Sequence, residues 1–181
     1  MDTIHLEYVA EDLISHKLQQ AGILVAKPKF DKKGTDLLAF LEMGDGVKFC
    51  RIQCKGRSVA KTDSNIKIPE KYVTSGFVVF LYIDAGNSDG DLYCFFESDI
   101  TSWNKTSDNE YRLSITKKTF SDKLEFYRFD ESKVRLIKGV IEAAKVSGEF
   151  RRLVYGTFNI TTSDDSAEIH GYVGTPPIQN T

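Results

Sequence analysis

The fold is decided by two segments, Gly34-Thr35-Asp36 and Cys50-Arg51-Ile52-Gln53-Cys54-Lys55, in which sixteen residues separate Asp36 from Gln53. Side chains alternate between the two faces of a β-strand. A strand over the second segment therefore turns its even-numbered, apolar residues to one face and its odd-numbered, polar residues to the other. We expect Cys50, Ile52 and Cys54 to be buried, and Gln53 and Lys55 to open onto a cleft beside Asp36.

The residues around these segments predict a helix followed by a hairpin. Residues 37–43 and 47–55 are expected to be strands joined by a tight Gly-rich turn, so their outer ends lie together and Asp36 approaches the second strand. Upstream, residues 4–21 have apolar side chains at helical intervals. Glu7 and Glu11 fall on the stripe of this helix that faces the sheet, and either could reach the same site.

The remaining elements complete an α/β domain. We expect strands at 23–26, 77–83, 92–96 and 111–115, a short helix within 69–74 and a longer helix over 130–149. The predicted order is helix, three strands, helix, strands, in one domain over residues 1–160. Its motif-bearing core spans about 4–97, and a C-terminal strand and helix span about 109–150. Residues 161–181 are predicted to form a flexible tail.

Composition excludes several classes of protein. The chain has 181 residues, 41% hydrophobic and 28% charged, with a net charge of -2, which is typical of a globular domain and not of a disordered one. Its longest apolar run, Phe77–Ile83, is too short to cross a membrane. Acids near the start argue against a secretory signal. Three cysteines cannot all pair within one chain, so we expect a reducing cytoplasm.

Three motifs give the chain a resemblance to a known superfamily. Ala10-Glu11, the segment from Gly34 to Ala39, and Ile52-Gln53-Cys54-Lys55 occur in the order found in the PD-(D/E)xK nucleases, which include restriction endonucleases and archaeal Holliday-junction resolvases. The resemblance covers roughly residues 4–84. It implies a restriction-endonuclease-like fold, a mixed central sheet flanked by helices.

The resemblance also implies a chemistry. Asp36, the Gln53 side chain and the Cys54 carbonyl would hold Mg²⁺, with Mn²⁺ as an alternative, and Glu11 would be a further ligand directly or through water. Lys55 would orient the attacking water and stabilise charge on the phosphate. The sequence departs from many members of the superfamily by having Gln53 in place of a glutamate, which puts metal affinity in question.

A local excess of positive charge points to DNA as the partner. Residues 27–61 contain nine Lys and Arg against four acids, an excess of 9 minus 4, or +5, although the net charge of -2 argues against tight nonspecific binding. Lys32, Lys33 and Arg57 are the expected phosphate contacts. The sequence leaves open a noncatalytic nucleic-acid-binding or protein-binding role on the same fold, RNA as the substrate, and a homodimer. On that view, Lys55 is a solvated strand-end lysine and Asp36 a turn residue.

Overall fold

The computed structural model describes residues 3–29, 34–44, 46–59, 63–86, 90–116, 120–144, 158–163 and 166–171. The chain forms two units, Met1–Gly148 and Glu149–Thr181, and each is described by itself. The helices are α1 (Thr3–Gln20), α2 (Glu97–Thr101), α3 (Phe120–Leu124) and α4 (Glu131–Glu142), with 3₁₀ turns η1 (Glu70–Tyr72) and η2 (Glu125–Tyr127). The strands of the first unit are β1 (Leu24–Ala26), β2 (Leu37–Met43), β3 (Gly46–Ser58), β4 (Ser64–Pro69), β5 (Phe77–Asp84), β6 (Asp91–Phe96), β7 (Asn104–Lys105) and β8 (Glu110–Ile115).

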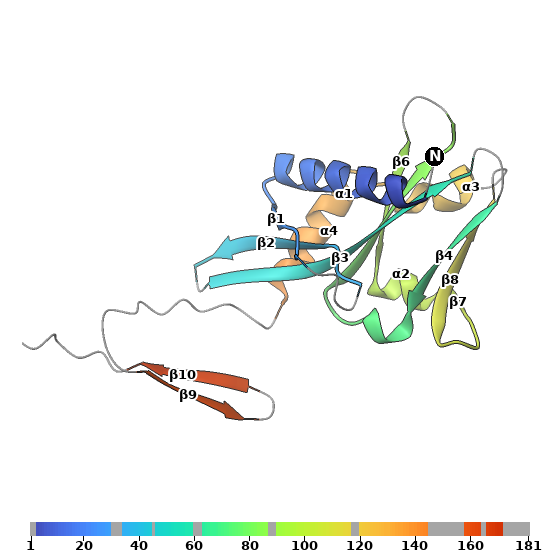
Figure 1. Ribbon diagram of the computed structural model, residues 1–181. Helices are drawn as coiled ribbons and strands as arrows, with labels where there is room; N and C mark the ends of the chain where they lie inside the picture. Colours follow the sequence, from blue (N-terminus) through green and yellow to red (C-terminus); the bar gives the residue numbers. More distant parts are fainter. Residues whose placement is uncertain are drawn as a thin grey trace, which may run out of the picture. The chain divides into compact units, whose positions relative to one another are not determined.

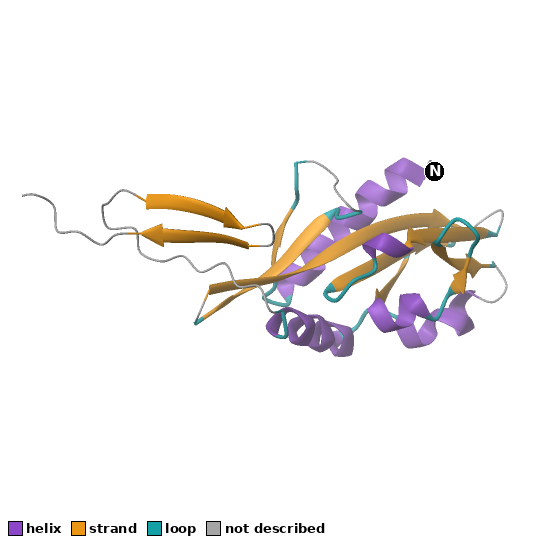
Figure 2. Cartoon of the chain, turned by 90° about the horizontal axis from the view of Figure 1, so that it is seen from below, coloured by secondary structure: helices purple, strands orange, loops and turns teal. Residues whose placement is uncertain are grey.

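The first unit is built on a five-stranded mixed sheet in the order β1-β2-β3-β5-β6 (Figure 1). The β3–β5 pair is parallel and the other neighbours are antiparallel. Helices flank this sheet, so the predicted α/β fold class is confirmed. The long, twisted strand β3 is central in the order and is visible along the sheet in both overall views (Figure 2).

Alternation along β5 divides the interior into two apolar clusters. Val78 and Phe80 pack with residues of α1 and α4 on one face of the sheet. Val79 and Leu81 pack on the other face with residues of β4 and β8, which belong to a second, three-stranded sheet ordered β4-β8-β7. Cys50, Ile52 and Cys54 of β3 all belong to the helix side, as their apolar alternation predicts. The odd-numbered residues of β3 therefore face the second sheet.

The connection between β3 and β5 corrects one prediction. The short helix predicted within 69–74 is the 3₁₀ turn η1, but residues 64–69, where the sequence predicts no strand, form β4. Ile66 and Ile68 alternate with polar residues and are fully buried against β8. This alternation spans only a few residues beside a Pro, so the local pattern does not predict a strand. Pairing with β8 makes these residues a strand.

The C-terminal elements also differ from expectation. The helix predicted over 130–149 is α4, which ends at Glu142 and is capped at its start by Asp130; residues 145–150 lie outside the described part of the chain. The structure also describes an antiparallel pair, β9 (Phe158–Ser163) with β10 (Ser166–Gly171), which begins before the predicted tail and continues into it. Among the described helices, none is long and apolar enough to span a membrane.

Candidate active site

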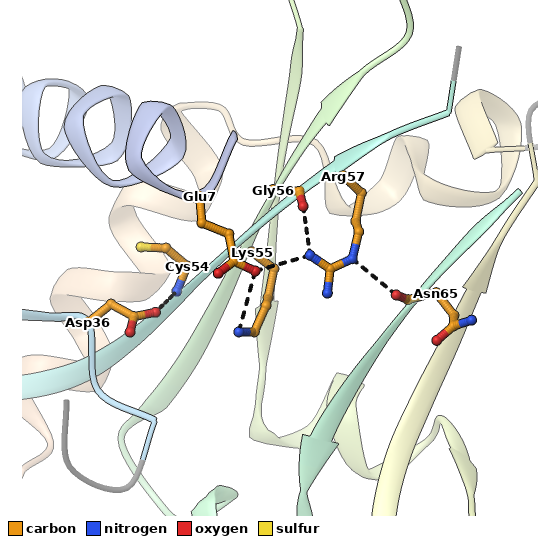
Figure 3. Close-up of polar contacts among 7 residues, drawn as sticks. All are labelled: Glu7, Asp36, Cys54, Lys55, Gly56, Arg57 and Asn65. Atoms are coloured by element: carbon orange, nitrogen blue, oxygen red, sulfur yellow. Dashed lines mark hydrogen bonds and ion pairs between the residues drawn. The ribbon is translucent and has the colours of Figure 1, made fainter. Parts of the chain in front are cut away.

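Asp36 is fixed where β2 begins. Its N–H donates to the carbonyl of Ile52 at 2.9 Å, and its Oδ2 accepts from the N–H of Cys54 at 2.6 Å (Figure 3). Both contacts are to β3, although Cys54 comes 18 positions after Asp36 in the chain. The predicted approach of Asp36 to the Gln53–Lys55 segment is therefore present.

The site lies where β3 changes partners. The ladder between β2 and β3 ends at Ile52, whereas β5 pairs with Arg51–Ser58. We call the side of Gln53–Ser58 that faces away from β5 the β3 edge. N–H and C=O of one strand residue point to the same side, so the Cys54 carbonyl points to this edge with the N–H that binds Asp36. Asp36 thus lies beside a backbone oxygen that could bind a cation.

Gln53 is more enclosed than a residue opening onto a cleft. Its exposed fraction is 6%, and its Oε1 has no hydrogen-bond partner among the described residues. Gly34 packs against it, because a Cβ on Gly34 would lie 2.9 Å from Gln53 Nε2 and 2.7 Å from Tyr72 Cδ2. Gly34 also has a φ of +64°, which favours glycine. Gly34 therefore packs closely against both the Gln53 amide and the Tyr72 ring.

Lys55 and Arg57 share a carboxylate from α1. Glu7 Oε1 lies 3.0 Å from Arg57 Nη1 and 3.6 Å from Lys55 Nζ. Figure 3 shows the Glu7 side chain reaching down from α1 between the two cations. Arg57 also donates to the carbonyls of Gly56 and Asn65. Lys55 is thus a partly buried, ion-paired residue, and the solvated-lysine interpretation does not describe it.

Gly56 explains why α1 comes so close to β3. A Cβ at this position would lie 2.4 Å from the backbone carbon of Leu6 and 2.7 Å from the nitrogen of Glu7. Only glycine leaves room for the helix backbone at this distance. Because Gly56 has no Cβ, α1 can approach β3 closely enough to place Glu7 beside Lys55 and Arg57.

Glu11, the predicted further metal ligand, takes part in an ion pair. Glu11 lies one turn further along α1, where its Oε2 pairs with the ammonium of Lys27. The Lys27 pKa is raised by this hydrogen bond. Of the two helix acids that sequence left open, Glu7 contacts Lys55, because Gly56 brings the first turns of α1 closest to that part of β3.

The Cys54 thiol has a raised pKa. Burial raises its pKa well above the ordinary value, and the carboxylates of Asp36, Glu11 and Glu7 raise it further, while Lys55 lowers it. The Cys54 thiol stays protonated, so its side chain is an unsuitable metal ligand or nucleophile.

The predicted phosphate contacts are placed only in part. Lys32 and Lys33 lie outside the described residues. Arg57 is described, and it binds Glu7 and two backbone carbonyls. Arg51, on the same face of β3, donates to Thr74 Oγ1 and to the carbonyl of Tyr72. These two arginines join β3 to the connection that follows it.

The described residues contain no group of three or more His, Cys, Asp or Glu side chains arranged to hold a metal ion. The predicted set of metal ligands is of another kind, because it combines the carboxylate of Asp36 with the Gln53 amide oxygen and the Cys54 backbone carbonyl. Gln53 Oε1 is buried and has no partner in the part of the chain that the structure describes, which fits a ligand at that position. The donor set consists of oxygens, which is what Mg²⁺ requires.

Comparisons with known proteins bear on the fold. No protein-family model matches the chain, and no curated protein matches it. The chain is similar in structure to the bacterial homing endonuclease I-Ssp6803I, with a TM-score of 0.52 and 12% identity over 79% of this chain and 98% of that one. The two chains therefore share an α/β fold.

Sequence reasoning missed several residues that build the site. Gly56 and Asn65 are not among the predicted site residues, and Tyr72 falls in the predicted short helix with no role assigned to it. The sequence signal for Gly56 is a glycine on the apolar face of a predicted strand, where a helix could pack closely. This signal becomes useful only when the helix that packs there is known.

Proposed function

We propose that the chain is a Mg²⁺-dependent endonuclease of the PD-(D/E)xK superfamily that hydrolyses phosphodiester bonds in DNA. The strongest support is Gln53 Oε1, a buried oxygen without a partner among the described residues, next to the residue that binds Asp36. Leaving such an atom unsatisfied costs about 1–3 kcal/mol, so its position favours a ligand. The fold shared with a homing endonuclease supports the same function.

Three oxygens would hold the metal: the Asp36 carboxylate, Gln53 Oε1 and the Cys54 carbonyl. Hard cations accept carboxylate, amide and backbone oxygens alike, so Mg²⁺ and Mn²⁺ both suit the set. Glu11 remains the proposed further ligand, directly or through water, as the resemblance to the superfamily implies. When bound, the metal would polarise the phosphoryl oxygen and make a bound water more acidic.

The chain's own residues would do the remaining work. The Lys55 ammonium donates hydrogen bonds and accepts none, so it would orient the attacking water and stabilise negative charge that develops on the phosphate oxygens. In the free protein this ammonium lies 3.6 Å from the Glu7 carboxylate. The Asp36 side chain stays aligned through the N–H of Cys54.

A noncatalytic DNA-binding protein is the second candidate. Two observations favour it: the described residues lack a cluster of three acids, and Asp36 and Glu7 already accept hydrogen bonds or ion pairs from the chain itself. In that case the basic residues matter for DNA and Asp36 does not.

Two variants decide between the candidates. Asp36→Asn keeps an oxygen that can accept from Cys54 but removes the charge, so Mg²⁺ should bind poorly and cleavage should be lost. Lys55→Ala should keep metal binding and reduce the rate by about 10² to 10³. Asp122→Asn, an exposed carboxylate on α3, is the control for the loss of one charge.

Cleavage is measured over a Mg²⁺ titration on single-stranded, duplex and branched DNA, with metal binding followed separately by thermal shift. Loss in the first two variants and wild-type rates in the control support the endonuclease. A wild-type protein that binds DNA but cleaves none of these forms, or two variants that cleave like it, would rule out catalysis and leave the binding role.

A further inference from the structure

Glu7 Oε1 occupies a point at which two cations converge. It lies 3.0 Å from Arg57 Nη1 and 3.6 Å from Lys55 Nζ. The side chains of the cations are 19% exposed and that of Glu7 is 31% exposed. These residues are therefore partly shielded from water, where attraction between charges is stronger than on an open surface.

The two cations are held by more than Glu7. Lys55 and Arg57 are two residues apart on β3, so their side chains leave the same face. The Arg57 guanidinium donates to the carbonyl of Gly56 at 2.7 Å and to that of Asn65 at 3.1 Å. These backbone contacts keep Arg57 beside Lys55 even if the Glu7 carboxylate moves away.

We propose that Lys55 and Arg57 form a binding site for one phosphate of the DNA backbone, and that Glu7 occupies this site in the free protein in place of a phosphate oxygen. The inference rests on the proposed function only in taking DNA as the ligand. Carboxylate and phosphate oxygens accept the same charge-assisted hydrogen bonds. DNA must therefore displace Glu7 to reach both cations.

The competition predicts a gain of affinity when Glu7 loses its charge. Glu7→Gln keeps the length of the side chain and an oxygen acceptor, but it no longer attracts the two cations as strongly. DNA affinity should rise roughly two- to fivefold, the factor that corresponds to one partly exposed ion pair. The salt dependence should become steeper by up to about one phosphate contact.

Glu110→Gln is the matched control. Glu110 is a partly buried glutamate, 25% exposed at its side chain, that pairs with Lys67 at 3.0 Å. Its substitution changes the net charge by the same amount, but it frees neither Lys55 nor Arg57. If the gain in Glu7→Gln comes from the proposed site, it should disappear when Lys55→Gln is added, since close partners are not additive.

The experiment measures binding of a short fluorescein-labelled DNA duplex by anisotropy, without divalent ions and over a series of salt concentrations. Circular dichroism and thermal unfolding check that each variant is folded. Glu7→Asp is the second variant, because it withdraws the carboxylate by one methylene and should give a smaller gain in the same direction.

A gain in Glu7→Gln that is absent from Glu110→Gln and removed by Lys55→Gln supports the inference. Unchanged or weaker binding by both Glu7 variants, or an equal gain in Glu110→Gln, overturns it. Because divalent ions are left out, the result does not depend on cleavage. If the wild-type protein never cleaves DNA, only the proposed endonuclease activity is contradicted. If it cleaves DNA but the Glu7 variants bind DNA with unchanged affinity, only the proposed phosphate site is contradicted.

Discussion

The two halves of β3 are built in different ways. Its first half, up to Ile52, pairs with β2 through a hairpin, whereas its second half pairs with β5 and carries Gln53, Lys55 and Arg57. Only Arg51 and Ile52 pair with both neighbours. The hairpin half is held by residues close in the chain, and the site half by α1, the segment before β2, and β4.

This difference shows where a site can form on a continuous strand. In the first half, backbone groups are used by the neighbouring strand β2. At the β3 edge, β2 has ended, so the N–H of Cys54 binds a side chain, Asp36, and the Gly56 carbonyl binds another, Arg57. A ligand can displace a side chain from a backbone group more easily than it can displace a neighbouring strand. The β3 edge can therefore bind a ligand where the hairpin half cannot.

The largest effect is expected at the junction of the two halves. Ile52 is fully buried, so Ile52→Ala should lower the free energy of unfolding by about 2–5 kcal/mol through lost apolar contact and a cavity. Phe49→Ala, at a 41% exposed position in the hairpin half, should cost less than about 1 kcal/mol. Urea unfolding followed by circular dichroism measures both. A larger cost at Phe49 would contradict the division of β3.

A second prediction concerns the contact between α1 and the site half. Gly56→Ala places a Cβ 2.4 Å from the backbone of Leu6, so the helix must shift, and we expect a loss of roughly 2–3 kcal/mol of stability. Gly139→Ala is the control, because nothing lies within 4 Å of its Cβ and alanine favours the helix by about 0.5–1 kcal/mol. Equal stability of both variants in urea unfolding would show that Gly56 is not needed for the close approach.

Gln53 provides a smaller effect of opposite sign. Gln53→Met keeps a similar volume and removes a buried oxygen without a partner among the described residues, so the protein should gain about 1 kcal/mol of stability. The same change removes a proposed metal ligand, so metal-induced stabilisation should fall. Gln19→Met, at an exposed position on α1, should change neither quantity. A loss of stability at Gln53 would indicate that its amide already has a partner.

The smallest effect compares the thiols of the two halves. Burial raises the pKa of Cys50 from 9.0 to about 12, whereas the Cys54 pKa is raised by burial and by nearby carboxylates. A raised folded-state pKa gives stability that is present below the unfolded-state pKa and is lost as pH rises above it. At about pH 9 the loss from Cys50 should be about 0.4 kcal/mol.

Urea unfolding at neutral and alkaline pH measures this loss. Cys50→Ala should remove its share of the pH dependence, although the smaller side chain also lowers stability at every pH. A Cys50→Ala protein with the same decline as the wild type would contradict the raised pKa.

Much of the hairpin half was readable from the chain. The predicted strand 37–43 coincides with β2, and the buried positions of Cys50, Ile52 and Cys54 follow from alternation. These features depend on neighbours in sequence, where period and turn residues are informative. The meeting of Asp36 with β3 also followed, because a hairpin brings its own ends together.

The site half could be predicted only in part. Sequence placed Glu7 and Glu11 on the same helical stripe, but it could not choose between them, since the choice depends on where α1 crosses β3. The strand β4 was missed because its six residues become a strand through pairing with β8. Tyr72 had no signal at all, since its role is to cover Gly34 and Gln53.

By itself, the sequence determined which residues could serve as a site and which face of β3 they occupy, because side-chain alternation is a property of the backbone. Tertiary structure decided which of them meet. The absence of a Cβ at Gly56 lets α1 approach until Glu7 reaches Lys55 and Arg57, and the end of β2 leaves Cys54 to bind Asp36. Such contacts join residues that are far apart in the chain, and no local pattern specifies them.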